Sequence, residues 1–117
     1  MKLYYMPGAC SLAAHIVLKW LKKPYETHRL TRDELKQPVF LGINPMGAVP
    51  ALSEEGWTLT QNIAILEYLG ESDTTLGLMG DGSERSRAEM RRWLGFINAD
   101  VHNTFGMLFG ARAWHDD

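Results

Sequence analysis

Hydrophobic and polar positions along the first thirty residues follow two different periods. Residues 2–5, KLYY, are aromatic-rich and end just before a Pro-Gly pair, which predicts a strand. Over residues 11–22 apolar side chains recur in pairs four apart, which predicts an amphipathic helix. Alternation over residues 25–30 predicts a second strand. A strand, a helix and a strand in this order form a βαβ unit, so we expect the two strands to be parallel.

Cap and turn residues organise the next part of the chain. Residues 31–34, TRDE, resemble a capping box. Pro38 indicates that a short helix begins beside it, because proline is favoured in a first helical turn, and that helix should end before Pro45. Residues 44–52, NPMGAVPAL, then predict a loop that leads into a short strand.

A hairpin and a second amphipathic helix follow this loop. Residues 54–56, EEG, predict a tight turn, and WTLT at 57–60 predicts the strand after it. Thr60 is the expected N-cap of a helix with the sequence QNIAILEYLGE, whose Ile and Leu residues supply an inner face.

The composition changes at residue 71. Residues 71–83 are rich in Ser, Thr, Gly and Asp, which predicts a linker. Ser83 is the expected cap of a long helix from residue 84 onward. The sequence therefore predicts a first domain over 1–70, the linker over 71–83, and a helical segment over 84–117.

Composition and charge give no sign of a nucleic-acid or membrane partner. Of the 117 residues, 45% are hydrophobic and 22% are charged, which is ordinary for a globular protein. Lys and Arg total 12 and Asp and Glu total 14, so the net charge of −2 gives no reason to expect a nucleic-acid or membrane partner. No apolar run approaches the roughly 18 residues of a membrane span. A single cysteine fits a reducing compartment, and we expect a mature N-terminus and a cytoplasmic protein.

That cysteine, Cys10, stands where the first strand turns into the first helix. The order of elements resembles a thioredoxin-like domain, whose dithiol form opens this helix with two cysteines two residues apart. Here the window reads CSLA, so Ala13 replaces the second cysteine and a dithiol cycle within one chain is excluded. Helix N-terminal N–H groups favour a thiolate, and Ser11 can donate a hydrogen bond to a sulfur. The alternative is a buried, inert cysteine.

Two further stretches complete a possible site. Val49-Pro50 can be a cis peptide that leaves the Val49 backbone to pair with an extended peptide, and a plain loop is the alternative. Gln61 and Asn62 stand at a helix N-terminus that suits a carboxylate, and ordinary capping by Thr60 is the alternative. Together with Cys10, these stretches describe a groove for a small extended thiol peptide with free carboxylates.

Four segments carry a family resemblance. They are KLYYMPGACSLAAHIVL, INPMGAVPAL, LTQNIAILEYL and RWLGFINADVHNTFGMLF. In this order they resemble a bacterial glutathione S-transferase of the beta, or cysteine, type along nearly the entire chain. The resemblance implies an α/β fold: a thioredoxin-like N-terminal domain (βαβ-α-ββα) followed by the first helix of an all-helical C-terminal domain.

The resemblance implies roles for residues around the first turn. Cys10 corresponds to the residue that contacts the glutathione sulfur and can form a mixed disulfide with it, and Ser11 is its expected neighbour in catalysis. Tyr5 lies near that thiol, where we expect a mainly structural role because the cysteine class does not depend on a tyrosine. Val49, before an expected cis Pro50, corresponds to the residue whose backbone pairs with the cysteinyl part of glutathione.

The other implied site residues are spread along the chain. Gln61 and Asn62 take the place where the γ-glutamyl end is held, although the family usually has a small or hydroxyl residue at the second position. Lys36 is placed to reach the glycyl carboxylate. His102 matches a histidine close to the thiol, and Asn98 lies one turn earlier on the same face. An imidazole there can favour a thiolate or polarise a ligand, and the alternative is a solvent-exposed helix histidine.

The resemblance also implies the partners. Glutathione is the co-substrate, a hydrophobic electrophile is the second substrate, and no metal is needed. Family members carry a helical domain of several helices, of which this chain contains the first. We therefore expect another copy of the chain to cover the exposed apolar side of the helix over 93–109, as a homodimer.

Three functions fit this sequence. The first is a glutathione transferase that stabilises the glutathione thiolate and joins it to electrophiles or exchanges it in thiol–disulfide steps. The second is a non-catalytic glutathione-binding or assembly module that lacks a complete electrophile pocket. The third is a monothiol reductase that depends on Cys10.

Overall fold

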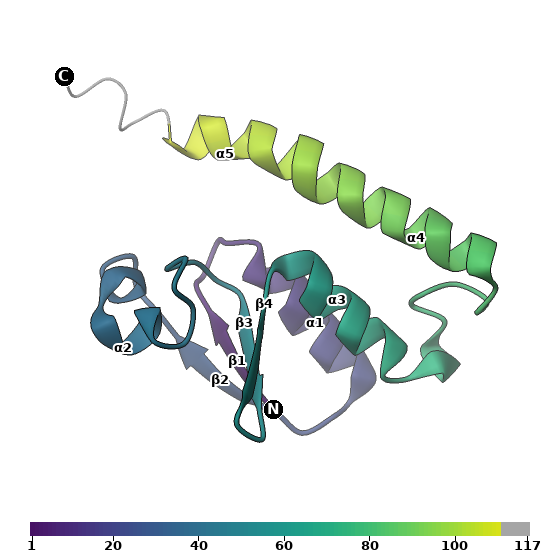
Figure 1. Ribbon diagram of the computed structural model, residues 1–117, viewed down its shortest axis with the longest axis horizontal. Helices are drawn as coiled ribbons and strands as arrows, with labels where there is room; N and C mark the ends of the chain where they lie inside the picture. Colours follow the sequence, from purple (N-terminus) through teal and green to yellow (C-terminus); the bar gives the residue numbers. More distant parts are fainter. Residues whose placement is uncertain (111–117) are drawn as a thin grey trace. The chain divides into compact units, whose positions relative to one another are not determined.

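The computed structural model describes residues 1–110, with side chains described up to residue 108. It divides into two compact units, one over Met1–Leu78 and one that begins at Met79. Figure 1 labels the helices and strands of both units.

The first unit is built on a four-stranded sheet in the order β2-β1-β3-β4. The strands are β1 (Lys2–Tyr5), β2 (Glu26–Arg29), β3 (Ala51–Glu54) and β4 (Trp57–Thr60). β1 and β2 are parallel, whereas β3 pairs antiparallel with both β1 and β4. The predicted βαβ unit and hairpin are thus confirmed. β2 and β4 are the edge strands, and all four side chains of β2 are exposed.

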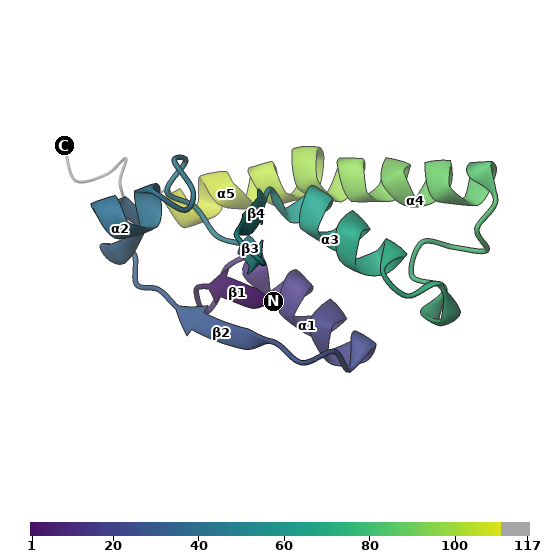
Figure 2. The same cartoon turned by 60° about the horizontal axis from the view of Figure 1, so that its bottom comes forward.

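Helices α1 (Ser11–Leu21) and α3 (Asn62–Glu71) contact each other along one face of this sheet, as Figures 1 and 2 show. Leu3 and Leu52 are paired across β1 and β3 and belong to the cluster that these two helices bury. Their neighbours along the strands, Tyr4 and Ala51, belong to a separate cluster, because successive side chains of a strand point to opposite faces.

That second cluster lies under the segment between β2 and β3. The segment contains two short helices, η1 (Glu34–Lys36) and α2 (Pro38–Leu41). Helix α2 begins at Pro38, as predicted. η1 opens with the predicted capping box: the Thr31 N–H donates to the Glu34 carboxylate at 2.7 Å, and the Glu34 N–H donates to Thr31 Oγ1 at 3.3 Å. The hydrogen bonds from the Thr31 hydroxyl and N–H hold the pKa of the Glu34 carboxyl below its usual value.

The prediction that Thr60 caps α3 is wrong. Thr60 is the last residue of β4 and pairs with Ala51, so its backbone belongs to the sheet. Gln61 takes the N-cap position with a positive φ of 73°, and its side chain makes no capping hydrogen bond. Such a backbone conformation costs a non-glycine residue about 1–3 kcal/mol, which other contacts of the fold must offset.

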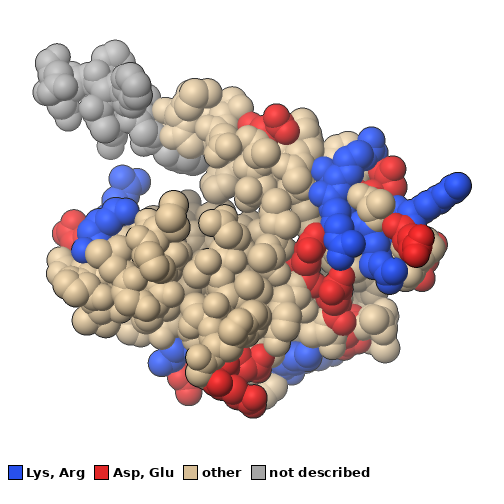
Figure 3. All heavy atoms as spheres, viewed as in Figure 1, with Lys and Arg blue, Asp and Glu red and all other residues tan. Residues whose placement is uncertain are grey.

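The long helix of the second unit begins where the sequence predicts, and its later course departs from the prediction. Ser83 caps α4 (Glu84–Phe96) by accepting a hydrogen bond from the Ser86 N–H at 3.2 Å. After α4 the backbone widens into a π-helical turn, η3 (Ile97–Val101), before α5 (His102–Gly110). The apolar pattern did not distinguish this turn from a continuous α-helix. In Figure 3 the Lys and Arg side chains of the viewed face gather most densely over the start of α4.

The apolar stripe of α1 supplies a matched pair for a stability measurement. Leu18 is fully buried in the core, whereas Leu12 on the same helix is 61% exposed. We expect Leu18→Ala to lower the free energy of unfolding by about 2–5 kcal/mol because it leaves a cavity. Leu12→Ala should change it by less than about 0.5 kcal/mol. Urea unfolding followed by circular dichroism measures both, and equal losses would contradict this account of the core.

Candidate functional site

The loop between β1 and α1 is fixed from inside by Ser11. Its side chain is fully buried, and its hydroxyl both accepts from the Met6 N–H and donates to the Met6 carbonyl, each at 3.2 Å. Gly8 provides the positive φ of 75° with which the chain reverses. The Ser11 hydroxyl is therefore used within the loop. This differs from the expectation that it donates to a sulfur, and it makes Ser11 a residue that positions Cys10.

Cys10 caps the N-terminus of α1 and is half-buried. Its Sγ lies 3.5 Å from the carbonyl oxygen of Val49, to which the thiol donates a hydrogen bond. Burial raises the pKa of the Cys10 thiol, and the backbone N–H groups of Cys10 and Ser11 lower it by less. The helix N-terminus thus acts on the sulfur as expected, but the loss of water outweighs it. Burial therefore favours the protonated form of the thiol.

The loop that carries Val49 faces the thiol from the other side. The Val49-Pro50 bond is cis, as the sequence allowed, and β3 begins directly after it. The exposed Lys36 side chain donates from Nζ to the carbonyl oxygen of Gly47 at 3.3 Å, two residues before Val49. The structure therefore brings Cys10, Val49 and Pro50 together, with Lys36 at the base of the same loop.

Sequence reasoning missed one residue of this loop, Asn44. It is only 4% exposed, and its side-chain amide bonds to the backbone of Met46 and Ala48. The dipeptide Asn44-Pro45 marked a turn in the sequence, and asparagine is known to bond to the backbone two residues ahead. That rule was sufficient to find the residue.

At the start of α3, Asn62 carries a buried polar atom. Its Oδ1 is shielded from water and has no hydrogen-bond partner in the described part of the chain. A buried carbonyl oxygen without a donor is costly, so this atom suits a ligand that brings an N–H group. Gln61, next to it, is exposed.

Tyr5 and His15 form an aromatic cluster. The ring centroids of Tyr5 and His15 lie 5.5 Å apart, and those of His15 and Tyr25 lie 5.6 Å apart, both in edge-on geometry. This packing agrees with the mainly structural role expected for Tyr5.

His102 and Asn98 belong to the second unit. Asn98 lies in the π-helical turn η3, and His102 is exposed at the first position of α5. The approach of His102 to the thiol stays a prediction.

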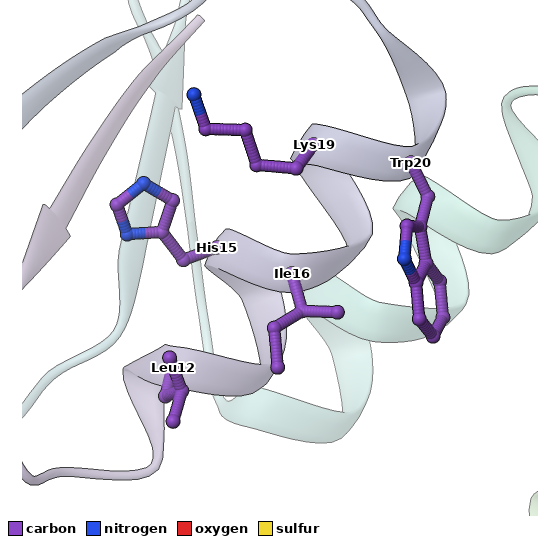
Figure 4. A pocket seen from close by; sticks show the side chains of 5 residues that line it. All are labelled: Leu12, His15, Ile16, Lys19 and Trp20. Atoms are coloured by element: carbon purple, nitrogen blue, oxygen red, sulfur yellow. The ribbon is translucent and has the colours of Figure 1, made fainter.

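A shallow hollow of about 410 Å³ lies elsewhere in the first unit, on the outer side of α1. Figure 4 shows its lining along this one helix: Leu12, His15, Ile16, Lys19 and Trp20. None of the residues discussed above as thiol or peptide contacts lines it.

The described part of the chain contains neither a metal-ligand cluster nor a membrane-spanning helix. Within residues 1–110 no three His, Cys, Asp or Glu side chains gather as metal ligands would. None of the helices in that range combines the length and the apolar character of a membrane span.

The thiol geometry generates a direct prediction, because the chain has one cysteine and alkylation reports on it alone. We expect iodoacetamide to alkylate folded Cys10 more slowly than the unfolded chain near neutral pH, with the pH midpoint shifted upward, because burial favours the protonated thiol. Mass spectrometry after timed quenching measures the rate, and the same chain in denaturant is the control. A midpoint below that of the unfolded chain would contradict this assignment.

Comparisons with known proteins agree with this architecture. Residues 1–71 match the family Glutathione S-transferase, N-terminal domain. Glutathione S-transferase GST-4.5 of Xanthomonas campestris is 53% identical over 114 residues, which are 97% of this chain and 56% of that protein.

Solved structures give the same result. The glutathione S-transferase of Xylella fastidiosa has a TM-score of 0.91 and 49% identity over 99% of this chain and 57% of its own. A sphingomonad glutathione S-transferase complexed with glutathione has a TM-score of 0.81 and 38% identity, over 93% of this chain and 56% of its own. The beta-class enzyme of Sphingomonas chungbukensis has a TM-score of 0.82 and 37% identity, with the same coverage.

This chain spans just over half the length of these relatives. Its sheet order, its cysteine at the start of α1 and its cis proline are those of a thioredoxin-like domain, and the matches cover nearly all of its residues. The chain belongs to the glutathione S-transferase family.

Proposed function

We propose that this chain binds glutathione at the slot between Cys10 and Val49 and acts in glutathione transfer. The observation that carries the proposal is the Cys10 thiol at the N-terminus of α1, 3.5 Å from the Val49 carbonyl. A peptide thiol that lies along Val49 brings its sulfur next to Cys10. A sphingomonad relative complexed with glutathione, 38% identical over 93% of this chain, supports the choice of ligand.

The two ends of glutathione have candidate contacts in the same unit. The Oδ1 of Asn62 can accept a hydrogen bond from the ammonium group of the γ-glutamyl end if its side chain turns out of its buried position, and the first turn of α3 suits the carboxylate. Lys36 can bind the glycyl carboxylate if its Nζ leaves the Gly47 carbonyl. We assign Gln61 beside Asn62 to the γ-glutamyl end as well.

The raised pKa of the Cys10 thiol suggests its role in conjugation. A thiol that stays protonated can donate its S–H to the glutathione thiolate and stabilise the negative charge on that sulfur. Glutathione first loses its thiol proton to a base in solution. Its thiolate then attacks the electrophilic carbon, a carbon–sulfur bond forms, and the leaving group departs with the bonding electron pair. His102 is the proposed second group near this sulfur.

Thiol–disulfide exchange is the other step that this thiol can support. The ionised Cys10 sulfur attacks the glutathione sulfur of a disulfide between glutathione and another thiol, a Cys10–glutathione disulfide forms, and the other thiol leaves as its thiolate. A glutathione thiolate then attacks the glutathione sulfur of the Cys10–glutathione disulfide, so that glutathione disulfide forms and the Cys10 thiolate is released. This step needs ionised Cys10, so its rate should rise with pH more steeply than that of conjugation.

A binding module without catalysis is the second candidate function. The specific observation in its favour is that the proposed contacts to glutathione, Cys10, Val49 and Asn62, all lie within residues 1–71, which match the N-terminal domain of the family.

The remaining partners are proposals of the same kind. We assign the protein to the cytoplasm as a homodimer, with a hydrophobic electrophile as second substrate. The apolar side chains exposed along α4 to α5 support an association surface. They are Trp93, Phe96, Ile97, Phe105, Met107 and Leu108.

Separate measurements of binding and turnover test the main proposal. We expect calorimetry to detect glutathione binding, and we expect conjugation to an aromatic halide above the solution rate. Cys10→Ala should lower turnover roughly tenfold or more, because it removes a hydrogen bond to a charged sulfur. Binding without turnover would contradict the transferase and support the module. Absence of binding would contradict both.

A disulfide substrate tests the monothiol reductase. The serine of Cys10→Ser keeps a hydrogen-bond donor but cannot form a disulfide, so for a monothiol reductase we expect this variant to lose all reduction of the substrate.

The γ-glutamyl contact predicts a ligand-dependent effect. We expect Asn62→Ala to raise the Kd for glutathione roughly tenfold, because it removes an acceptor for a charged ammonium group. The Kd for cysteinylglycine, which lacks the γ-glutamyl group, should stay the same. Asn103→Ala, at an exposed position of α5, is the matched control. Equal losses for both peptides would assign Asn62 a role in folding instead.

A further inference from the structure

We infer that Asn44 is the positioning residue that fixes the Val49 carbonyl opposite Cys10. The inference rests on the proposed function for its effect on glutathione. The geometry behind it stands on the free chain alone.

Asn44 is the centre of a closed hydrogen-bond network. Its side-chain Nδ2 donates to the carbonyl of Ala48 at 2.7 Å, and its Oδ1 accepts from the N–H of Met46 at 3.1 Å. Its own N–H donates to the carbonyl of Phe40 at 2.8 Å, and its carbonyl accepts from the N–H of Gly47 at 2.9 Å. The side chain and the backbone of Asn44 are thus both bonded, in a residue that is only 4% exposed.

This network ends one residue before the site. Ala48 precedes Val49, so the 2.7 Å bond to the Ala48 carbonyl sets where the next peptide unit lies. Pro45 has no N–H and a fixed φ, so the chain after Asn44 is stiff, and the Asn44 side chain closes the turn together with the backbone bond from the Gly47 N–H to the Asn44 carbonyl.

The same loop is closed from its other side by η1. Gly47 has a φ of +58°, and a Cβ on it would lie 2.7 Å from the carbonyl oxygen of Leu35. Lys36 donates to the Gly47 carbonyl at 3.3 Å. Gly47 therefore lies against η1 with no room for a side chain, and its N–H is bonded to the Asn44 carbonyl on the other side.

The result of both constraints is the 3.5 Å separation between Cys10 Sγ and the Val49 carbonyl oxygen. Val49 has no polar side chain that could hold this distance. Loss of the Asn44 amide would remove the bonds to the Ala48 carbonyl and the Met46 N–H, so the loop would no longer be held in this conformation. The Cys10 thiol would then lose its acceptor.

Two variants and one control test the inference. Asn44→Ala removes both side-chain bonds, whereas the shorter hydroxyl of Asn44→Ser can accept only from the residue two positions ahead. We expect the Kd for glutathione to rise roughly tenfold or more in the alanine variant and less in the serine variant. Asn103→Ala is the matched control, and circular dichroism checks folding.

A second readout does not depend on glutathione. A thiol that donates to a carbonyl is held in its protonated form, so freeing it should shift the pH midpoint of Cys10 alkylation downward in both Asn44 variants. A merely structural asparagine would lower the unfolding temperature and leave this midpoint in place. If neither variant folds, hydrogen exchange of the wild-type chain remains: the Met46 and Gly47 amides should exchange more slowly than exposed loop amides.

The outcomes separate the inference from the proposed function. If the wild-type chain binds no glutathione, the proposed function fails, while the alkylation midpoint still tests Asn44. If the wild-type chain binds and folded Asn44 variants keep both the Kd and the midpoint, the inference is overturned. Unprotected Met46 and Gly47 amides would overturn it as well.

Discussion

The contact between the Cys10 thiol and the Val49 carbonyl joins two loops that are 39 residues apart in the chain, and the site is arranged around it. One loop is held by Ser11, whose hydroxyl is bonded twice to Met6. The other is held by Asn44 and by η1. Both loops emerge from neighbouring strands, β1 and β3, so the sheet sets the distance between them. The parts that position the thiol are therefore all within the first unit.

The order of elements followed from local patterns in the sequence. Aromatic content predicted β1, alternation predicted β2, the four-residue period predicted α1, and the capping residue Ser83 marked the start of α4. These features depend on neighbours a few residues away, which a single sequence contains. The π-helical turn at Ile97–Val101 does not follow from such patterns, and we have no physical account of its position.

The sequence indicated which residues lie near the thiol better than it indicated the direction of the thiol pKa shift. The thioredoxin-like order of elements identified Cys10 and Val49. The sequence predicted a thiolate, because the N–H groups at a helix N-terminus are the one influence on the thiol pKa that it reveals. How deeply a side chain is buried depends on residues far along the chain, and that burial reverses the direction of the pKa shift. Ser11 was misjudged for a related reason, since its partner Met6 is fixed only when the loop closes.

Strand β2 has a consequence for how molecules of this protein can meet. It is an outer strand of the sheet, and its side chains Glu26, Thr27, His28 and Arg29 are all solvated. Charged side chains along an edge strand disfavour pairing with a strand of another molecule, because such pairing would remove water from the charged groups. Continuous sheets that run from one molecule to the next are thus disfavoured at this edge, which leaves the other edge strand, β4, and the helical surfaces for self-association.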